Sequence, residues 1–254
     1  DPLPFVAIPT TAGTGAEVTK NAVIAVPDAG RKVSLRDQRM LPDLAIVDPA
    51  LTDNAPREVT LASGLDALTQ VVEPYLTPRA NPLTDALCQA AIPMALRALQ
   101  RLAAGEDPSA RDDMCFVSLC GGMALANAGL GAVHGLAGVI GGRLGAPHGL
   151  ICGRLLGPVL VENHQALLDE GAPVHRFAEL GGWMSAAWEV SQAAPFGDLS
   201  VLLDRWEVPR LSQWMTQQTD LAAIAEEAAA ASSMKANPCV LSQAALVRIM
   251  RAAA

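Results

Sequence analysis

The chain has 254 residues, of which 51% are hydrophobic and 17% charged, and its formal net charge is −8. With this acidic balance, few aromatic residues and no basic patch, the composition argues against a nucleic-acid partner. No uninterrupted apolar run reaches the ~18 residues that a bilayer-spanning helix needs, so we expect no membrane partner either.

Five cysteines are spaced irregularly and form no Cys-x-x-Cys pair. An odd number at such spacing argues against a disulfide framework and for a reducing compartment, so we expect a cytoplasmic protein. No motif supports a catalytic cysteine, and a free cysteine usually packs as a small hydrophobic residue.

The first 50 residues predict short strands. Apolar runs at 5–9, 21–26 and 43–48 are bounded by turn residues, and 32–35 can pair with the second run as a hairpin. After the first run comes Thr10-Thr-Ala-Gly-Thr-Gly15, which can offer backbone N–H groups and hydroxyls to an anion. This loop lacks the lysine of a P-loop and the G-x-G-x-x-G spacing, so a structural turn remains an equal alternative.

The chain beyond Pro56 has helical periodicity. Apolar residues at 65, 68, 71 and 72 predict a helix over 62–73 that ends at Pro74. Asp66 and Gln70 are four residues apart, so they lie on one face of it. Similar patterns predict further helices at 86–104, 107–128, 150–161, 165–183, 198–205, 219–234 and 242–250, with a break at Pro158. The fold class that follows is mainly α, with a minor β component at the start.

A glycine-rich stretch from Gly129 to Gly149 contains His134 and His148, with Arg143 as its only charged side chain. Neutral imidazole is the commonest metal ligand in proteins, and glycines allow close backbone approach. Two histidines in this setting suggest a buried metal site, whereas either histidine alone would more often be an ordinary core histidine with a satisfied hydrogen bond. Asp66 would complete an Asp-His-His set for Fe²⁺ or Zn²⁺, and an open position on such a metal can polarise a substrate oxygen.

Several motifs together carry a resemblance to a known family. They are, in chain order, Pro9-Thr-Thr-Ala-Gly-Thr-Gly15, Gly64-Leu-Asp-Ala-Leu68 with Glu73 beyond it, Ala80-Asn-Pro82, Leu130-Gly-Ala-Val-His134 and Pro147-His-Gly149. In this order they resemble the iron-containing (group III) alcohol dehydrogenases. The match extends from about Pro4 to the carboxyl end and includes Asn237-Pro238.

The resemblance implies an organisation and a chemistry. Residues 1–55 would be the carboxyl-terminal part of an α/β nucleotide-binding domain, and residues 56–254 an all-helical metal-binding, catalytic domain. The implied reaction is NAD(P)-linked interconversion of a small-molecule alcohol and an aldehyde or ketone, in a homo-oligomer such as a homodimer. Asp66, His134 and His148 would be catalytic metal ligands for Fe²⁺ or Zn²⁺. The implied cofactor-binding residues are Thr10, Thr11, Gly13, Thr14 and Gly15.

The chain departs from the family pattern in two places. Gln70 stands where the family has a fourth ligand, a histidine, and its amide is a poorer ligand, so Zn²⁺ with three protein ligands and water is one expectation. A metal-independent enzyme similar to the maleylacetate reductases is an alternative. The family's Gly-Gly-Gly-Ser phosphate loop is also absent and the first residue is Asp1, so we expect part of a longer product, or an inactive, truncated helical interaction module.

Overall fold

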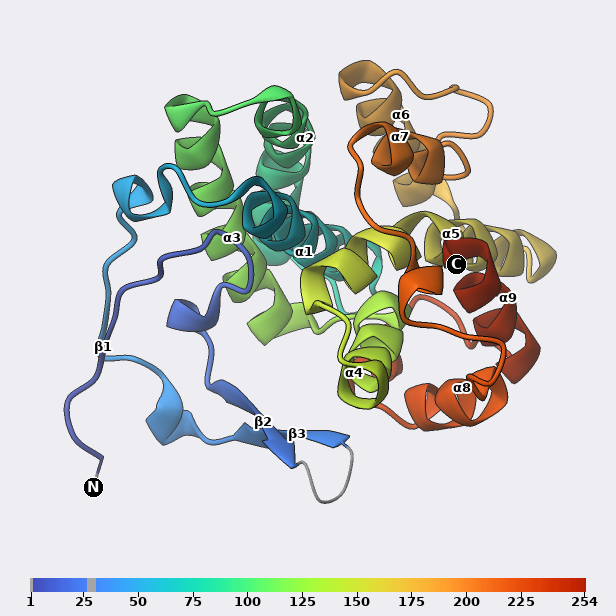
Figure 1. Ribbon diagram of the computed structural model, residues 1–254, viewed down its shortest axis with the longest axis horizontal. Coiled ribbons are helices and arrows are strands. Elements are labelled where there is room, and N and C mark those ends of the chain that lie inside the picture. The colour runs from blue at the N-terminus through green and yellow to red at the C-terminus, as the bar shows by residue number, and fades with distance from the viewer. Residues whose placement is uncertain (1, 27–30) are drawn as a thin grey trace.

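The computed structural model describes residues 2–26 and 31–254. In this part of the chain, the α-helices are α1 (Arg57–Leu76), α2 (Pro82–Ala104), α3 (Pro108–Ala128), α4 (Ala132–Leu144), α5 (His148–Asp169), α6 (His175–Ala187), α7 (Leu199–Arg205), α8 (Leu221–Ala229) and α9 (Gln243–Ala253). Helix α1 lies near the centre and packs against α2 and α3 on one side and α5 on the other (Figure 1). Helix α4 packs against α5 and α8. The prediction of a mainly α fold is therefore confirmed.

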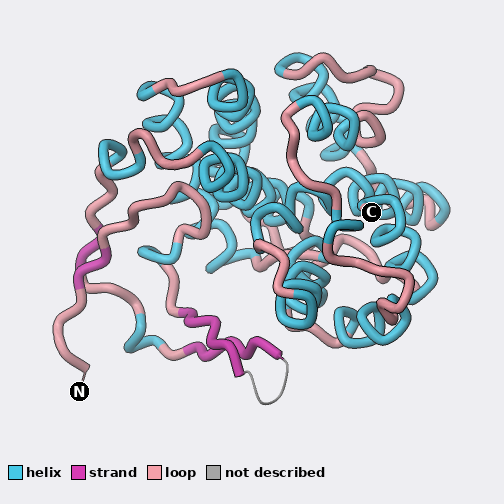
Figure 2. The backbone as a smooth tube through the Cα atoms, viewed as in Figure 1, coloured by secondary structure: helices cyan, strands magenta, loops and turns pink. Residues whose placement is uncertain are grey.

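The strands form two small pairs at the amino-terminal edge of the molecule (Figure 2). β2 (Asn21–Val26) and β3 (Arg31–Arg36) are antiparallel, which confirms the predicted hairpin, although its turn at 27–30 lies outside the described residues. β1 (Val6–Ala7) and β4 (Leu44–Ala45) pair in parallel.

The runs at 5–9 and 43–48 do contain strands, but each strand is shorter than the predicted run. Only two residues of each run pair, and the side chains of Phe5 and Leu44 are 49% and 52% exposed. Within the described chain, β1 and β4 pair only with each other. The side chains of Val6 and Leu44 remain exposed to solvent.

Prolines do not end the helices as predicted. Pro74 lies inside α1, which continues to Leu76, and Pro158 lies inside α5. Pro74 has no N–H to donate to the carbonyl oxygen of Gln70, and α1 continues for only two residues beyond it. The predicted helix at 165–183 was also wrong, because α5 ends at Asp169 and the next helix starts at His175. Gly171, with φ of +67°, and Pro173 separate them.

The core forms where α5 crosses α1. The four apolar side chains that periodicity identified, Leu65, Leu68, Val71 and Val72, are fully buried, as are Val133, Leu136, Ile140 and Ile151. At the crossing, a Cβ on Gly149 would lie 1.9 Å from the carbonyl oxygen of Ala62. The two backbones meet so closely that only glycine fits, and this contact determines where the first turn of α5 lies on α1.

Among the described helices, none by itself has the length and apolar composition to cross a membrane. Helices α3 and α4 pass that test only when taken together, as a pair bent by 103°.

Candidate metal centre

Three helices bring four potential ligands to one point. Asp66 comes from α1, His134 from the first turn of α4, and His148 and Cys152 from the first turns of α5. One ligand atom from each of these residues lies within 4.8 Å of the others. The three residues that were expected to bind metal are thus together, and a cysteine lies beside them.

His134 is held between two carboxylates. Its Nδ1 is 2.6 Å from Oε2 of Glu73, and its Nε2 is 3.2 Å from Oδ1 of Asp66. Because a carboxylate has no proton to give, Nδ1 donates to Glu73 and the imidazole ring is fixed with Nε2 toward Asp66. A carboxylate behind the ring is the usual support of a metal-binding histidine.

Side chains from other helices also position the start of α4. The N–H of Val133 donates to Oε1 of Glu73 at 2.7 Å, and the N–H of Ala132 donates to Oδ1 of Asn237 at 3.1 Å. These N–H groups have no partner inside the helix, so both acceptors cap it. Glu73 therefore fixes both the helix that carries His134 and the imidazole itself.

The donor set fits a cation. Without a metal, a proton on Nε2 of His134 lies toward the anionic oxygen of Asp66, and a bound metal ion would take the place of that proton. Two acceptors at 3.2 Å repel each other unless a proton or a metal ion lies between them. His148 Nε2 is 3.9 Å from the same oxygen, and its side chain is 39% exposed, so the cluster can be reached from solvent.

The cluster favours the anionic forms of its acidic members. Burial raises the pKa of Asp66, but the hydrogen bond from His134 and the charges of His134 and His148 together outweigh it, and the pKa is lowered. Burial likewise opposes a lowered pKa for Cys152, and the charges of His148 and His134 overcome it. Burial lowers the pKa of His134, yet Cys152, Glu73 and Asp66 together raise it well above its ordinary value. The negative charge of Cys152 also raises the pKa of His148 against burial.

Sequence reasoning missed Cys152 and the role of Glu73. Cys152 follows His148 by four residues, the spacing that places two side chains on one helix face. Glu73 follows Asp66 by seven, which again brings both to one face of α1. Neither spacing is specific enough by itself to identify a metal site.

Gln70 is buried beside this cluster but is bonded elsewhere. Its Nε2 donates to the carbonyl oxygen of Gly13 at 2.6 Å. The amide thus ties α1 to the loop Thr10–Gly15. Gln70 as a metal ligand stays a prediction.

The loop Thr10–Gly15 is held by close backbone contact with α3. Gly15 has φ of +57°, its N–H donates to Oγ of Ser118 at 3.2 Å, and a Cβ on it would lie 2.6 Å from Cα of Gly122. Gly13 and Gly15 are buried. The loop threonines Thr10, Thr11 and Thr14 are exposed, which leaves their hydroxyls available to a ligand.

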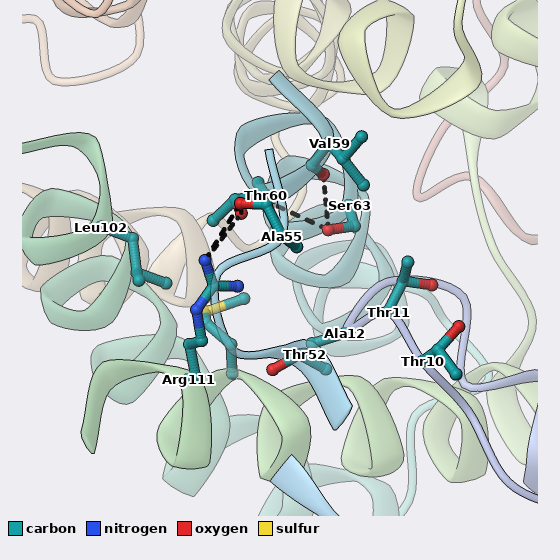
Figure 3. A pocket seen from close by; sticks show the side chains of 12 residues that line it. Thr10, Thr11, Ala12, Thr52, Ala55, Val59, Thr60, Ser63, Leu102 and Arg111 are labelled. Carbon is teal, nitrogen blue, oxygen red and sulfur yellow. Dashed lines mark hydrogen bonds between the residues drawn. The ribbon is translucent and has the colours of Figure 1, made fainter. Parts of the chain in front are cut away.

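A pocket lies between this loop and the start of α1 (Figure 3). Thr10 and Thr11 line one side of it, and Arg111 lies opposite with hydrogen bonds to Thr60 Oγ1 and the carbonyl oxygen of Ala55. None of the four clustered ligands lines it. The described residues therefore present two separate features, a metal-binding cluster and a hydroxyl-bearing loop with a pocket.

Two family models match the chain. The model for the Fe-containing alcohol dehydrogenase family, C-terminal, covers residues 60–254, and the model for iron-containing alcohol dehydrogenase covers residues 1–49.

Individual relatives agree with these models. Probable alcohol dehydrogenase EutG from Salmonella typhimurium is 33% identical over 252 residues, which cover 99% of this chain and 62% of that protein. 1,3-Propanediol dehydrogenase from Klebsiella pneumoniae is 41% identical over 171 residues, covering 65% of this chain and 44% of the relative. The solved alcohol dehydrogenase from Oenococcus oeni has a TM-score of 0.86 at 33% identity, over 100% of this chain and 67% of that one. The chain spans less than two thirds of the length of either curated relative.

Proposed function

Because the chain belongs to the iron-containing alcohol dehydrogenase family, we propose that it takes part in interconverting an alcohol and an aldehyde or ketone, with NAD(P) accepting or donating the hydride. The observation that carries this proposal is the convergence of Asp66, His134 and His148 from three helices. The names of the relatives, among them a 1,3-propanediol dehydrogenase and a long-chain-alcohol dehydrogenase, support an alcohol as the substrate.

The residues of the cluster have distinct tasks in this proposal. A bound divalent ion would act as a Lewis acid toward the substrate oxygen. Asp66 supplies a buried anionic ligand, and His134 supplies a nitrogen whose direction Glu73 determines. His148 is half-buried, so its side of the cluster is the side from which a substrate can approach.

Residues 1–55 would provide part of the cofactor site. We place the cofactor along the loop Thr10–Gly15, with Thr10, Thr11 and Thr14 donating hydroxyls and the buried Gly13 and Gly15 permitting close backbone approach. Gln70 links this loop to the helix that carries Asp66, so it couples the two halves of the proposed site.

The proposal is tested by following NADH and NADPH absorbance after primary alcohols and 1,3-diols are added to the protein reconstituted with Zn²⁺ or Fe²⁺. We expect alcohol-dependent reduction of one nucleotide and its loss in His134→Ala. His175→Ala removes an exposed histidine outside the cluster and serves as the matched control.

Three other results would contradict the proposal in different ways. Activity that survives both metal removal and His134→Ala would indicate a metal-independent reductase. Tight metal binding without turnover of any alcohol would indicate that the cluster is not catalytic here. Neither metal binding nor turnover in the folded protein would favour an interaction module.

A further inference from the structure

We propose that Cys152 is the fourth protein ligand of this metal centre and that its thiolate makes the centre select Zn²⁺ over Fe²⁺. The inference rests on the metal-dependent function proposed above and goes beyond it in ligand set and metal choice. It starts from the place of Cys152 in the fold.

Cys152 and His148 form an i, i+4 pair on α5, so both project from one face of the helix. Sγ of Cys152 lies 3.7 Å from Nε2 of His148. The close crossing of α5 over α1 at Gly149 and Ala62 brings this face onto Asp66. The position of Cys152 is therefore set by the same contact that positions His148.

The distances within the cluster fit one small cation. Nitrogen and oxygen ligands at ~2.0 Å and sulfur at ~2.3 Å from Zn²⁺ place neighbouring tetrahedral ligands roughly 3.3 to 3.7 Å apart. The separations here are 3.2 Å for His134 Nε2 to Asp66 Oδ1, 3.9 Å for His148 Nε2 to Asp66 Oδ1, and 3.7 Å for Cys152 Sγ to His148 Nε2. The other three pairs lie within 4.8 Å, so the four side chains must move closer together to coordinate one ion.

Cys152 is also distinguished from the other cysteines by its surroundings. Cys88 is equally buried, but it lies on α2 outside the cluster. Cys152 faces two imidazoles and a carboxylate within the 4.8 Å cluster, an environment unlike an apolar core. Thiolate is a soft ligand that favours Zn²⁺, and Zn²⁺ also stands above Fe²⁺ in the general order of affinities.

The alternative fourth ligand, Gln70, is held in place by its amide nitrogen. Its amide nitrogen donates to the carbonyl oxygen of Gly13, and this bond directs the amide group to the loop Thr10–Gly15. Both Gln70 and Cys152 lie one helical turn beyond a cluster member. Sγ of Cys152 lies within the 4.8 Å cluster, whereas the amide nitrogen of Gln70 is directed to Gly13. The fourth ligand thus comes from α5, and Gln70 serves the loop.

Cobalt substitution tests the assignment without measuring activity. The metal-free full chain is titrated with Co²⁺, and its visible d–d bands and near-ultraviolet thiolate-to-cobalt charge-transfer band are recorded. We expect both in the wild type, loss of the charge-transfer band in Cys152→Ala and Cys152→Ser, and no change in Cys88→Ala. Competition with a chelator should show preference for Zn²⁺ over Fe²⁺ in the wild type and a smaller preference in Cys152→Ser.

Each result separates this inference from the proposed function. Cobalt binding without a charge-transfer band in the wild type overturns the role of Cys152 and leaves a site with three ligands standing. A band that persists in both Cys152 variants also overturns it. Failure of the folded wild type to bind Co²⁺ or Zn²⁺ overturns the metal centre itself. The wild-type spectrum decides the thiolate ligand even if a Cys152 variant does not fold.

Discussion

Close backbone contacts at two glycines position the metal-binding cluster and the loop Thr10–Gly15, and the two contacts differ in how much of their surroundings they bury. At Gly149, α5 presses on the carbonyl of Ala62 and encloses a cluster whose Asp66 and Cys152 are buried. At Gly15, the loop presses on Gly122 of α3 and leaves threonine hydroxyls exposed. The first contact suits a desolvated ion site, and the second suits an extended ligand that stays partly in solvent. Helix α1 connects them, through Asp66 at one site and Gln70 at the other.

The largest expected effect comes from adding a methyl group at the contact between Gly149 and Ala62. Gly149→Ala places a Cβ against the Ala62 carbonyl, and backbone atoms must move to accept it. We expect a loss of about 3 kcal/mol in unfolding free energy, together with loss of metal, because α5 carries two members of the cluster. Urea unfolding and metal analysis measure both. Unchanged stability would show that α5 does not need this close crossing.

Glu73→Gln should weaken the cluster without disturbing its packing. The new amide can still accept from Val133, but its NH₂ group would face Nδ1 of His134 and place the imidazole proton on Nε2, toward the metal. We expect metal affinity to fall ~10- to 100-fold, as for other residues that support a ligand. Chelator competition measures the change. Equal affinity in both proteins would exclude Glu73 as the residue that orients His134.

Gln70→Ala should act on the loop and leave the metal in place. The carbonyl of Gly13 loses its buried donor, which we expect to cost roughly 1 to 2 kcal/mol of unfolding free energy. NADH binding, followed by fluorescence, should weaken, whereas metal stoichiometry stays constant. If Gln70→Ala instead lost metal while its NADH binding was unchanged, Gln70 would be a metal ligand and not a support of the loop.

The smallest effect is expected at Gly138, in α4. A Cβ there would meet nothing within 4 Å, so Gly138→Ala is the matched control for Gly149→Ala. We expect a stabilisation of about 0.5 to 1 kcal/mol, because alanine loses less conformational freedom than glycine in a helix. Thermal unfolding measures it. A marked destabilisation would mean that glycine is needed throughout this stretch and not only at the crossing.

Local patterns in the sequence were enough to predict much of the chain. Apolar periodicity identified α1 and its buried Leu65, Leu68, Val71 and Val72, because a helix that packs on one face repeats its apolar positions every three to four residues. The order of motifs indicated the family and the set Asp66, His134 and His148. Helix ends were less predictable: α1 continues through Pro74 and α5 through Pro158, since packing compensates for a single missing hydrogen bond.

The sequence by itself determined which residues share a helix face, because that depends only on spacing within one helix. Asp66 with Gln70 was visible as such a pair. His148 with Cys152 was not, because the predicted helix began at Leu150 and α5 begins at His148. Only the tertiary structure decided that Cys152 lies with the cluster and that Gln70 bonds to Gly13. Both outcomes depend on how closely segments about 60 to 90 residues apart approach, and that distance is set by glycine contacts and packing that no local pattern encodes.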